Sequence, residues 1–498
     1  MASATNPLRS LARAAAGPVS RGFQASIFPT TTRTAAAVAP FSTSTVLSAQ
    51  PAKKASGVVT SQKQKKNYKK KSAQSSGPVR KPNPGERKAF RKRILLSNNS
   101  AIEVQGADTL TADAMADAAS AGRLFALPDP LVDQLRVLEA FKPTQSWHLF
   151  RKPHVLLRAE AVELMAKLKV SVDRKEAARI VLRGSRLSGK SLAILQAISY
   201  GLLNNWVVIN LPEGKTPSIR MPSLMLVCET NLQSSIANDL TNGNTEYTPI
   251  PDTEPIQFSQ PVYTLKLLQS IHTANRKALD ALKLEKDWSR LNSSLKPGST
   301  LSDLILSCRE SEFAWPTFSA LWTELTLPGR PPLLFTIDGL AHMNKLSAYR
   351  DPSFNPVHAH DLTLLRTFVQ ALSGATPLPN GGAVIAATSE SNTLRHPSQE
   401  LVLDQLEAIQ ASKKDAIPGP NPYEKKYDDR VYDALKTCEV LRLEGINETE
   451  TRTLLQYWGA SGMFRGIVNM QTIKEKWALS GHGNIGEMER ASLMTMRL

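Results

Sequence analysis

The stretch GSRLSGKS, residues 184–191, constrains this chain more than any other, because its spacing of glycines, lysine and serine is that of a phosphate-binding loop. A loop that wraps phosphates must turn its N–H groups inward, which requires positive φ and close backbone approach, and Gly184 and Gly189 fit that need. We expect Lys190 to reach the terminal phosphates and the Ser191 hydroxyl to bind Mg²⁺. The residues between them complete the predicted nucleotide contacts: Ser185, Arg186, Leu187 and Ser188.

The sequences on both sides of the loop predict a strand before it and a helix after it. Ile180–Leu182 is a short apolar run of the kind that a buried parallel strand needs. After the loop, apolar residues recur at helical spacing with no proline between them: Leu192, Leu195, Ile198 and Leu202. A tight turn in an unrelated α/β domain is the alternative, but the order of strand, glycine loop and helix favours a phosphate site.

A phosphate site also needs a carboxylate for magnesium, usually from the end of a neighbouring strand. The segment RPPLLFTIDGL reads as a buried strand that ends at Asp338, the expected position of this magnesium residue, which would act through water. Gly339 follows it, where many hydrolytic enzymes of this class place a glutamate, so we expect slow hydrolysis and assign no catalytic residue. The alternative for Asp338 is a simple turn at the strand end, because Asp-Gly is a turn signal.

Further strands are expected from Trp206, Leu224 and Gly381, which would complete an open parallel sheet. The third ends in Thr388 and Ser389, which are candidate sensors of the γ-phosphate, although local capping is the more common role of such a pair. Glu390 is the nearby residue that could position a water molecule. The expected fold is therefore α/β, a P-loop NTPase with an open parallel sheet of the AAA or STAND type, followed by helices.

The amino-terminal part of the chain carries most of the positive charge. Residues 1–85 contain 14 lysines and arginines and no acidic residue, in a chain with a formal net charge of +17. Residues 1–50 combine Arg9, Arg13, Arg21 and Arg33 with alanine, serine and threonine, which is the composition of a mitochondrial presequence, the alternative being a disordered cytosolic tail. Import into the matrix would require removal of the presequence, and the sequence does not identify the peptide bond that is cleaved.

The next segment, rich in lysine, has too few apolar residues to fold alone. Such segments bind polyanions by neutralising their phosphates. Because the presequence indicates a mitochondrial protein, RNA is the leading partner of this segment. The alternative is that the segment is a solubilising linker. No apolar run approaches the roughly 18 residues of a membrane span, and the three cysteines make no metal-ligand spacing. We expect five regions: a presequence (1–50), a basic RNA-binding extension (51–95), a helical region (96–172), a P-loop nucleotide-binding domain (173–410) and a helical carboxyl-terminal region (411–498).

An ordered set of segments resembles the death-associated-protein family of mitochondrial small-subunit ribosomal proteins, in its fungal form. The matching segments are KPHVLLRAEAVELMAKLK, RIVLRGSRLSGKSLAILQAISYGLLNNWVVINLP, SQPVYTLKLLQSIHTANRKAL and LLFTIDGLAHMNKLSAYRD. The resemblance implies a GTP- or GDP-binding protein in the head of the mitochondrial ribosomal small subunit, near the large subunit and in contact with rRNA and other mitoribosomal proteins. On that resemblance, Gly184, Gly189, Lys190 and Ser191 contact phosphate and magnesium, and Asp338 helps to hold the metal.

The base preference stays open between guanine and adenine. A guanine-reading N-K-x-D motif is absent, since NKLS at 344–347 lacks the aspartate, and ATP therefore remains an alternative to GTP. Two functions remain from different classes: a structural ribosomal protein that is stabilised by its nucleotide, and a mitochondrial ATPase or GTPase that switches or remodels a partner. The missing glutamate after Asp338 and the basic extension favour the first.

Overall fold

The computed structural model describes residues 94–142, 145–211, 241, 246–251, 253, 255–293, 295–296, 298–389, 396–412 and 417–493. The expected presequence, nearly all of the basic extension, the strand expected from Leu224 and the candidate Glu390 lie outside these ranges.

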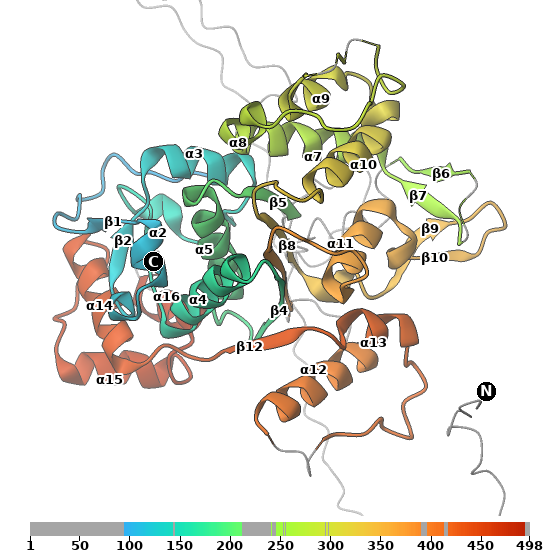
Figure 1. The fold of residues 1–498 in the computed structure, drawn as a ribbon. Coiled ribbons are helices and arrows are strands. Elements are labelled where there is room, and N and C mark those ends of the chain that lie inside the picture. Colours follow the sequence, from blue (N-terminus) through green and yellow to red (C-terminus); the bar gives the residue numbers. More distant parts are fainter. Residues whose placement is uncertain are drawn as a thin grey trace, which may run out of the picture. The chain divides into compact units, whose positions relative to one another are not determined.

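A five-stranded parallel sheet forms the centre of the described chain (Figure 1). Its order is β12 (Glu439–Leu443), β4 (Ala177–Gly184), β11 (Gly382–Ala387), β8 (Leu333–Asp338) and β5 (Val207–Leu211). All four strand pairings are parallel, and the three strands expected at the loop, at Asp338 and from Gly381 are adjacent. The prediction of a parallel α/β sheet is confirmed.

Both faces of the sheet are covered, which explains why its strands are continuous apolar runs. In β4, Ile180 and Leu182 face one hydrophobic cluster and Val181 faces the other, as the two-residue period of a strand requires. The first face is covered by α2 (Ala112–Ala116), α3 (Asp129–Val137), α4 (Ala159–Asp173) and α5 (Lys190–Leu203). The second is covered by α7 (Pro261–Ala274), α8 (Arg276–Ala281), α9 (Leu301–Ser307), α10 (Ala314–Leu325), α11 (Thr363–Ser373), α12 (Pro397–Gln410) and α13 (Asp429–Leu435).

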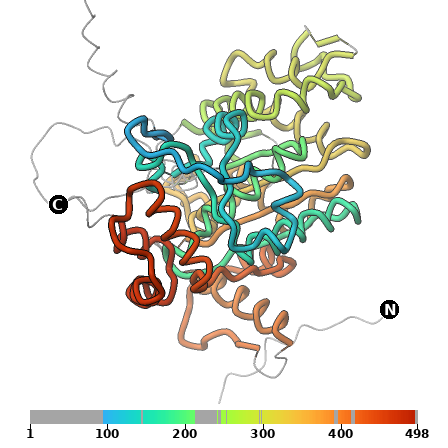
Figure 2. The backbone as a smooth tube through the Cα atoms, turned by 90° about the vertical axis from the view of Figure 1, so that its left-hand side faces the viewer, coloured from blue at the N-terminus to red at the C-terminus, as the bar shows by residue number. Residues whose placement is uncertain are grey.

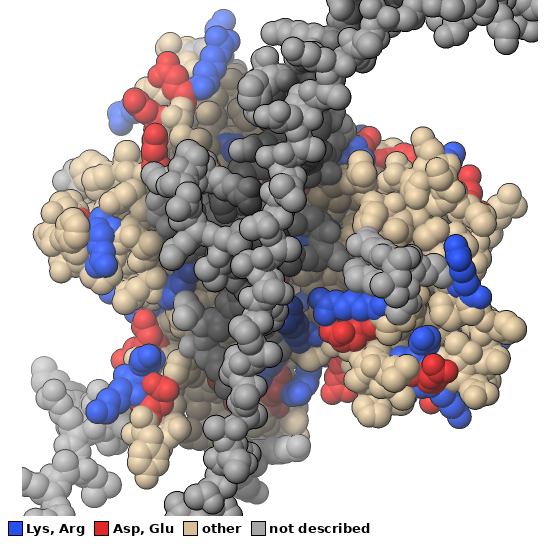
Figure 3. Space-filling view, turned by 180° about the vertical axis from the view of Figure 1, so that it is seen from behind, with Lys and Arg blue, Asp and Glu red and all other residues tan. Residues whose placement is uncertain are grey.

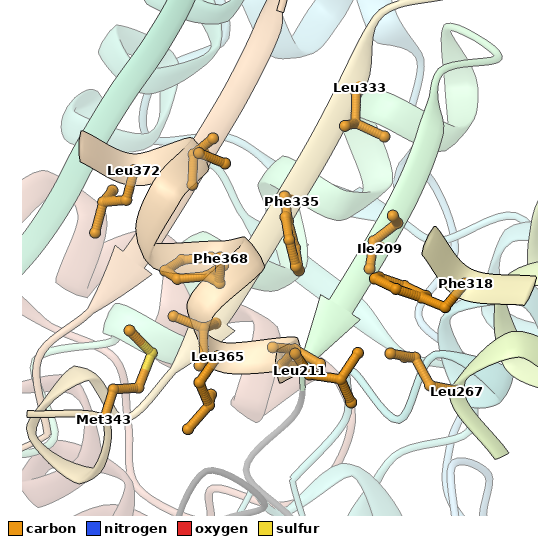
Figure 4. Packing of buried hydrophobic residues seen from close by; sticks show 14 of the residues in the cluster. Ile209, Leu211, Leu267, Phe318, Leu333, Phe335, Met343, Leu365, Phe368 and Leu372 are labelled. Atoms are coloured by element: carbon orange, nitrogen blue, oxygen red, sulfur yellow. The ribbon is translucent and has the colours of Figure 1, made fainter. Parts of the chain in front are cut away.

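Aromatic rings fill the centre of the second cluster. Phe335 of β8 meets Phe368 of α11 edge to face, with ring centroids 4.9 Å apart (Figure 4). Both side chains are fully buried. Edge-to-face pairs of this kind stabilise a core beyond the area they bury, so α11 is fixed against the strand that carries Asp338.

Among the described residues, three small sheets lie outside the central sheet. They comprise β1 (Asp108–Thr109), β2 (Leu124–Ala126) and β3 (His154–Leu156); β6 (Thr248–Ile250) and β7 (Gln257–Ser259); and β9 (Leu346–Arg350) and β10 (Pro356–His358). The region 96–172, predicted to be helical, therefore also contains a short sheet. Its apolar residues join the cluster under α5, so this region shares its core with the central sheet.

In the carboxyl-terminal region, α13 is followed by the edge strand β12. The helices after β12 are α14 (Glu448–Ala460), α15 (Met470–Leu479) and α16 (Ile485–Leu493). The expectation of a purely helical segment after residue 411 was wrong for Glu439–Leu443, which pairs with β4 as the edge strand of the sheet. The helices pack on Leu124, Leu149 and Phe150, so the two ends of the described chain lie side by side (Figure 2).

A capping box starts α14 at Asn447. The Asn447 side chain accepts from the Glu450 backbone N–H, and the Glu450 carboxylate accepts from the Asn447 backbone N–H. Glu450 also accepts from the backbone N–H of Ala159 at the start of α4, at 3.3 Å. The start of α14 is therefore joined to the start of the helix that precedes β4.

Candidate phosphate-binding site

The order of strand, loop and helix predicted around GSRLSGKS is confirmed. The strand β4 ends at Gly184 and α5 begins at Lys190. Gly189 has a φ of 100° and Leu187 a φ of 64°, so the loop turns twice through the left-handed region. Such turns point successive N–H groups to one side, which is the geometry that binds anions at a helix amino terminus. Phosphate binding itself stays a prediction.

The two glycines of the loop are needed for different reasons. Gly189 needs its freedom of φ, whereas Gly184 is not among the residues with positive φ. A Cβ on Gly184 would lie 2.4 Å from the backbone oxygen of Leu443 in β12 and 2.7 Å from Oγ of Ser188. Gly184 is therefore required by close packing against the neighbouring strand, and positive φ, expected for both glycines, holds only for Gly189.

Lys190 is buried and lies across the loop. Its Nζ donates to the backbone oxygens of Gly184 and Ser185, at 2.5 and 2.7 Å. The next residue, Ser191, is half-buried in the first turn of α5. The structure thus brings the ammonium group to the concave side of the loop, where a lysine of this motif contacts phosphate.

The carboxyl-terminal segment contacts the loop directly. Nδ2 of Asn484 donates to the backbone oxygen of Arg186 at 2.7 Å, and the backbone N–H of Gly486 donates to the oxygen of Leu187 at 3.2 Å. A Cβ on Gly486 would lie 2.6 Å from Cβ of Leu187. We call residues 484–486 the carboxyl-terminal clasp. No motif in the sequence indicated it.

Arg158, at the start of α4, contacts the loop from another direction. Its guanidinium group donates to the backbone oxygen of Ser188 at 2.7 Å and to that of Glu444 at 2.6 Å. It also pairs with Glu160 at 2.8 Å, which balances its buried charge. One side chain therefore joins the loop to the segment between β12 and α14, and sequence analysis did not single it out.

Asp338 lies in the same row of the sheet as Leu182, two residues before the loop. It pairs with Ala387 of β11, which in turn pairs with Leu182 of β4. Two strand spacings separate Asp338 from β4, which is about 10 Å. The strand of Asp338 was expected to be a neighbour of the loop strand, but β11 lies between the two strands.

The Asp338 carboxylate forms an ion pair with Lys142, which follows α3. Both side chains are largely buried, with exposed fractions of 8% and 15%. Ser191 and Asp338 supply the hard oxygen donors that Mg²⁺ prefers, so these residue types fit the metal. However, Lys142 already neutralises the carboxylate, and magnesium at this position would have to compete with it. The described residues contain no cluster of three or more metal-ligating side chains.

The candidate sensors lie at the end of β11, between the loop strand and the strand of Asp338. The backbone N–H and Oγ1 of Thr388 both donate to the backbone oxygen of Leu182, at 3.0 and 3.1 Å. Thr388 is buried and its hydroxyl group extends the pairing of β11 with β4, which favours the capping role. Ser389 follows it and is half-buried.

The incomplete guanine motif does not read a base. Asn344 is buried, where its Nδ2 donates to Oε1 of Gln399 at 2.8 Å and its Oδ1 lies 3.1 Å from Nε2 of His360. Burial lowers the pKa of His360 to about 3 and that of nearby His342 to about 4, so both rings are neutral at physiological pH. This network is part of the protein core.

A mostly apolar cavity of about 120 Å³ adjoins the loop at Gly189. Its walls come from the region before α4 and from α5, α14 and α16. Residues that line it include Phe150, Leu192, Ala193, Trp458, Ile485 and Glu489.

The parallel sheet, with helices on both faces, places this chain in the α/β class. The sequence pattern of the mitochondrial ribosomal death-associated protein 3 family matches residues 155–217 and 232–491. The chain is 46% identical to the small ribosomal subunit protein mS29 of Neurospora crassa over 435 residues, which cover 87% of each chain. It is 22% identical to the mS29 protein of Schizosaccharomyces pombe, covering 69% of this chain and 66% of that one.

The chain therefore belongs to the mitochondrial ribosomal death-associated protein 3 family. This membership confirms the family expected from the ordered motifs and the expected mitochondrial location. A solved structure, a Walker-type ATPase of Pyrococcus abyssi, covers 68% of this chain and 66% of its own at 12% identity. Its TM-score of 0.32 is too low to support an argument about fold.

Proposed function

We propose that this protein is a structural component of the mitochondrial small ribosomal subunit that holds a purine nucleotide, GTP or GDP, at residues 184–191. Family membership supports the ribosomal part, because the family is mitochondrial and ribosomal and its relatives are named small ribosomal subunit proteins. The geometry of the loop, with Lys190 across its concave side, supports the nucleotide part. That geometry is the observation on which the proposal for the site depends.

The nucleotide acts as a structural ligand in this proposal. The loop is contacted by Arg158 from the region before the sheet and by the clasp at 484–486 from the end of the chain. A ligand that orders this loop would therefore stabilise three segments that are distant in sequence. A ligand at a thousand times its Kd adds about 4 kcal/mol, a large share of a domain's stability.

Rapid hydrolysis is not expected. Attack on a γ-phosphate needs a group that positions water beside the metal. Gly339 has no side chain for this task, and Asp338 is paired with Lys142. The helices that follow the sheet support the proposed AAA-like or STAND-like arrangement of the domain.

The basic extension, residues 51–95, would contact rRNA by neutralising its phosphates. Other mitoribosomal proteins, and a contact with the large subunit, complete the proposed set of partners. Within the described ranges, none of the helices combines the length and apolar composition that a membrane span requires.

The test measures thermal unfolding of the purified chain with and without GDP, GTP and ATP, together with hydrolysis in a single turnover. We expect nucleotide to raise the midpoint temperature of thermal unfolding, and we expect hydrolysis to be slow or undetectable. Lys190→Ala should lose the stabilisation, because it removes the ammonium group that lies across the loop, whereas Lys436→Ala, which removes an exposed partner of Asp433, should keep it. Rapid conversion to diphosphate would instead support the second function, a switch or remodeller, and no stabilisation by any nucleotide would contradict the site.

A further inference from the structure

A groove of about 280 Å³ lies between α10 and α11, on the face of the sheet opposite to α5. One wall is aromatic and comes from Trp315, Phe318 and Trp322, which lie along one face of α10. Trp315 stacks on Phe318, with ring centroids 5.8 Å apart, and Trp322 contacts Phe335 of β8 at 5.4 Å. Phe318 and Phe335 belong to the buried cluster (Figure 4), so both half-buried indole rings are held against the core.

The other wall of this groove is polar and comes from one face of α11. Its residues are Thr363, Arg366, Thr367 and Gln370. Thr363 is only 2% exposed, yet its Oγ1 has no hydrogen-bond partner among the described residues. Arg366 is half-buried, and no hydrogen bond or ion pair joins its guanidinium group to the part of the chain that the structure describes. Buried polar groups are nearly always paired in folded proteins, so the unpaired hydroxyl group beside the arginine indicates an acceptor that comes from outside these residues.

We propose that this groove is a docking site for a segment of a partner protein that presents an acidic side chain between apolar residues. The carboxylate accepts from Arg366 and from the Thr363 hydroxyl group, which lie three positions apart and therefore on neighbouring turns of α11. Apolar neighbours of that acid pack on the indole rings of Trp315 and Trp322. Thr363 is the first residue of α11, and the amino-terminal end of a helix favours negative charge. Tryptophan and arginine are also among the residues that contribute most to binding at protein interfaces.

The charge of the groove favours a protein segment over RNA as its occupant. Single-stranded RNA stacks its bases on aromatic rings, but its backbone needs several cations along the groove that holds it. Among the described residues that line this groove, Arg366 is the charged one. One guanidinium group matches one carboxylate and would leave most phosphates of an RNA strand without a partner. The docking site rests on the proposed function, which places the chain among other proteins of the small subunit, and adds to it the face that contacts one of them.

The experiment replaces Ser319, an exposed residue of α10 that lines the groove, by the photoreactive amino acid p-benzoylphenylalanine in the full chain assembled into small subunits. We expect light to join position 319 to a protein segment that carries aspartate or glutamate, as identified by mass spectrometry, in a product that resists ribonuclease. Arg366→Glu should reduce this crosslink roughly 10-fold or more, because two carboxylates then face each other. Replacing the acid of the crosslinked partner by arginine should restore the crosslink to Arg366→Glu, which a folding defect in that variant would prevent.

Arg276→Glu is the matched control, with the same change of charge outside the groove. Arg276 is exposed at the start of α8, where it pairs with Asp280, so its substitution should leave the crosslink unchanged. The docking site would be overturned by a crosslink to rRNA, by a crosslinked protein segment without an acid, by an equal crosslink in Arg366→Glu, or by no crosslink in subunits that contain the chain. Each of these results would leave the proposed function standing. Absence of the wild-type chain from sedimented small subunits would contradict the proposed function, and the docking site with it.

Discussion

At the scale of single residues, the ion pair between Lys142 and Asp338 has the largest effect on the candidate magnesium site. The sequence suggested Asp338 as a magnesium residue, and the structure adds a buried lysine as its partner. A buried carboxylate that loses its partner is costly, about 3–5 kcal/mol when the pair is fully enclosed. Lys142 and Mg²⁺ are therefore alternative partners of the same carboxylate.

We predict that Lys142→Met destabilises the protein by about 3 kcal/mol in EDTA and that Mg²⁺ with nucleotide restores part of the loss. The reason is that the variant keeps most of the apolar stem but leaves the Asp338 carboxylate without its cation. Thermal unfolding with GDP, with Mg²⁺ or with EDTA, gives the measurement. Lys266→Met is the control, since Lys266 pairs with Glu139 at the surface and should show little change. If Mg²⁺ stabilised wild type and Lys142→Met equally, Asp338 would not be the metal residue.

At the scale of elements, the important contact is between the start of α16 and the loop before α5. Gly486 is the second residue of α16, and its backbone N–H donates to Leu187. Leu187 has a positive φ, which a residue with a β-carbon keeps only when its surroundings hold it. The clasp is thus one of the contacts that maintain the loop conformation.

We expect Gly486→Ala to destabilise the protein by about 1–3 kcal/mol and to reduce its stabilisation by nucleotide. The added Cβ would stand 2.6 Å from Cβ of Leu187, so α16 or the loop must move. Gly459→Ala, within α14, meets only a side-chain atom of Val468 at 3.8 Å and should be neutral or slightly stabilising. Denaturant unfolding with and without GDP measures both effects. Full nucleotide stabilisation in Gly486→Ala would show that the clasp does not support the site.

At the scale of the whole molecule, charge is divided unequally along the chain. Residues 1–85 supply +14 of the formal net charge of +17, so positive and negative charges nearly balance in the remaining residues. Figure 3 shows basic and acidic side chains interspersed over one face of the described residues. Electrostatic attraction to RNA is therefore expected from the amino-terminal segment more than from the folded domain.

Deletion of residues 53–93 is predicted to weaken incorporation into the small subunit while nucleotide binding survives, because this segment supplies phosphate neutralisation and lies outside the loop domain. The defect should be largest at low salt and should shrink as salt is raised, because the deleted phosphate contacts are the ones that salt weakens. Sedimentation of assembled subunits, together with a GDP binding assay, measures the two properties. Replacing the lysines of the segment by arginine keeps the charge and should assemble normally. Normal assembly of the deletion variant at low salt would refute the RNA anchor.

The local sequence was enough to predict the positions of the loop and of the strands around it. The positions of Gly189 and Lys190 follow from spacing within eight residues, and β8 and β11 are apolar runs because both of their faces are buried. The edge strand β12 was missed because Glu439 and Arg442 are exposed, which leaves an apolar run of only two residues. The strands of the small sheet β1–β3 are too short to show a period.

What surrounds the loop was decided only by the tertiary structure. Arg158 reaches Ser188 across 30 positions, and Asn484 reaches Arg186 across 298. Hydrogen bonds from a side chain to so distant a backbone oxygen leave no periodic pattern in the sequence, because each requires only one suitable side chain. The sequence by itself therefore determined where a phosphate could bind. The path of the chain through the sheet decided which residues, among them Lys142, Arg158 and the clasp, surround that position, because folding alone brings such distant segments together.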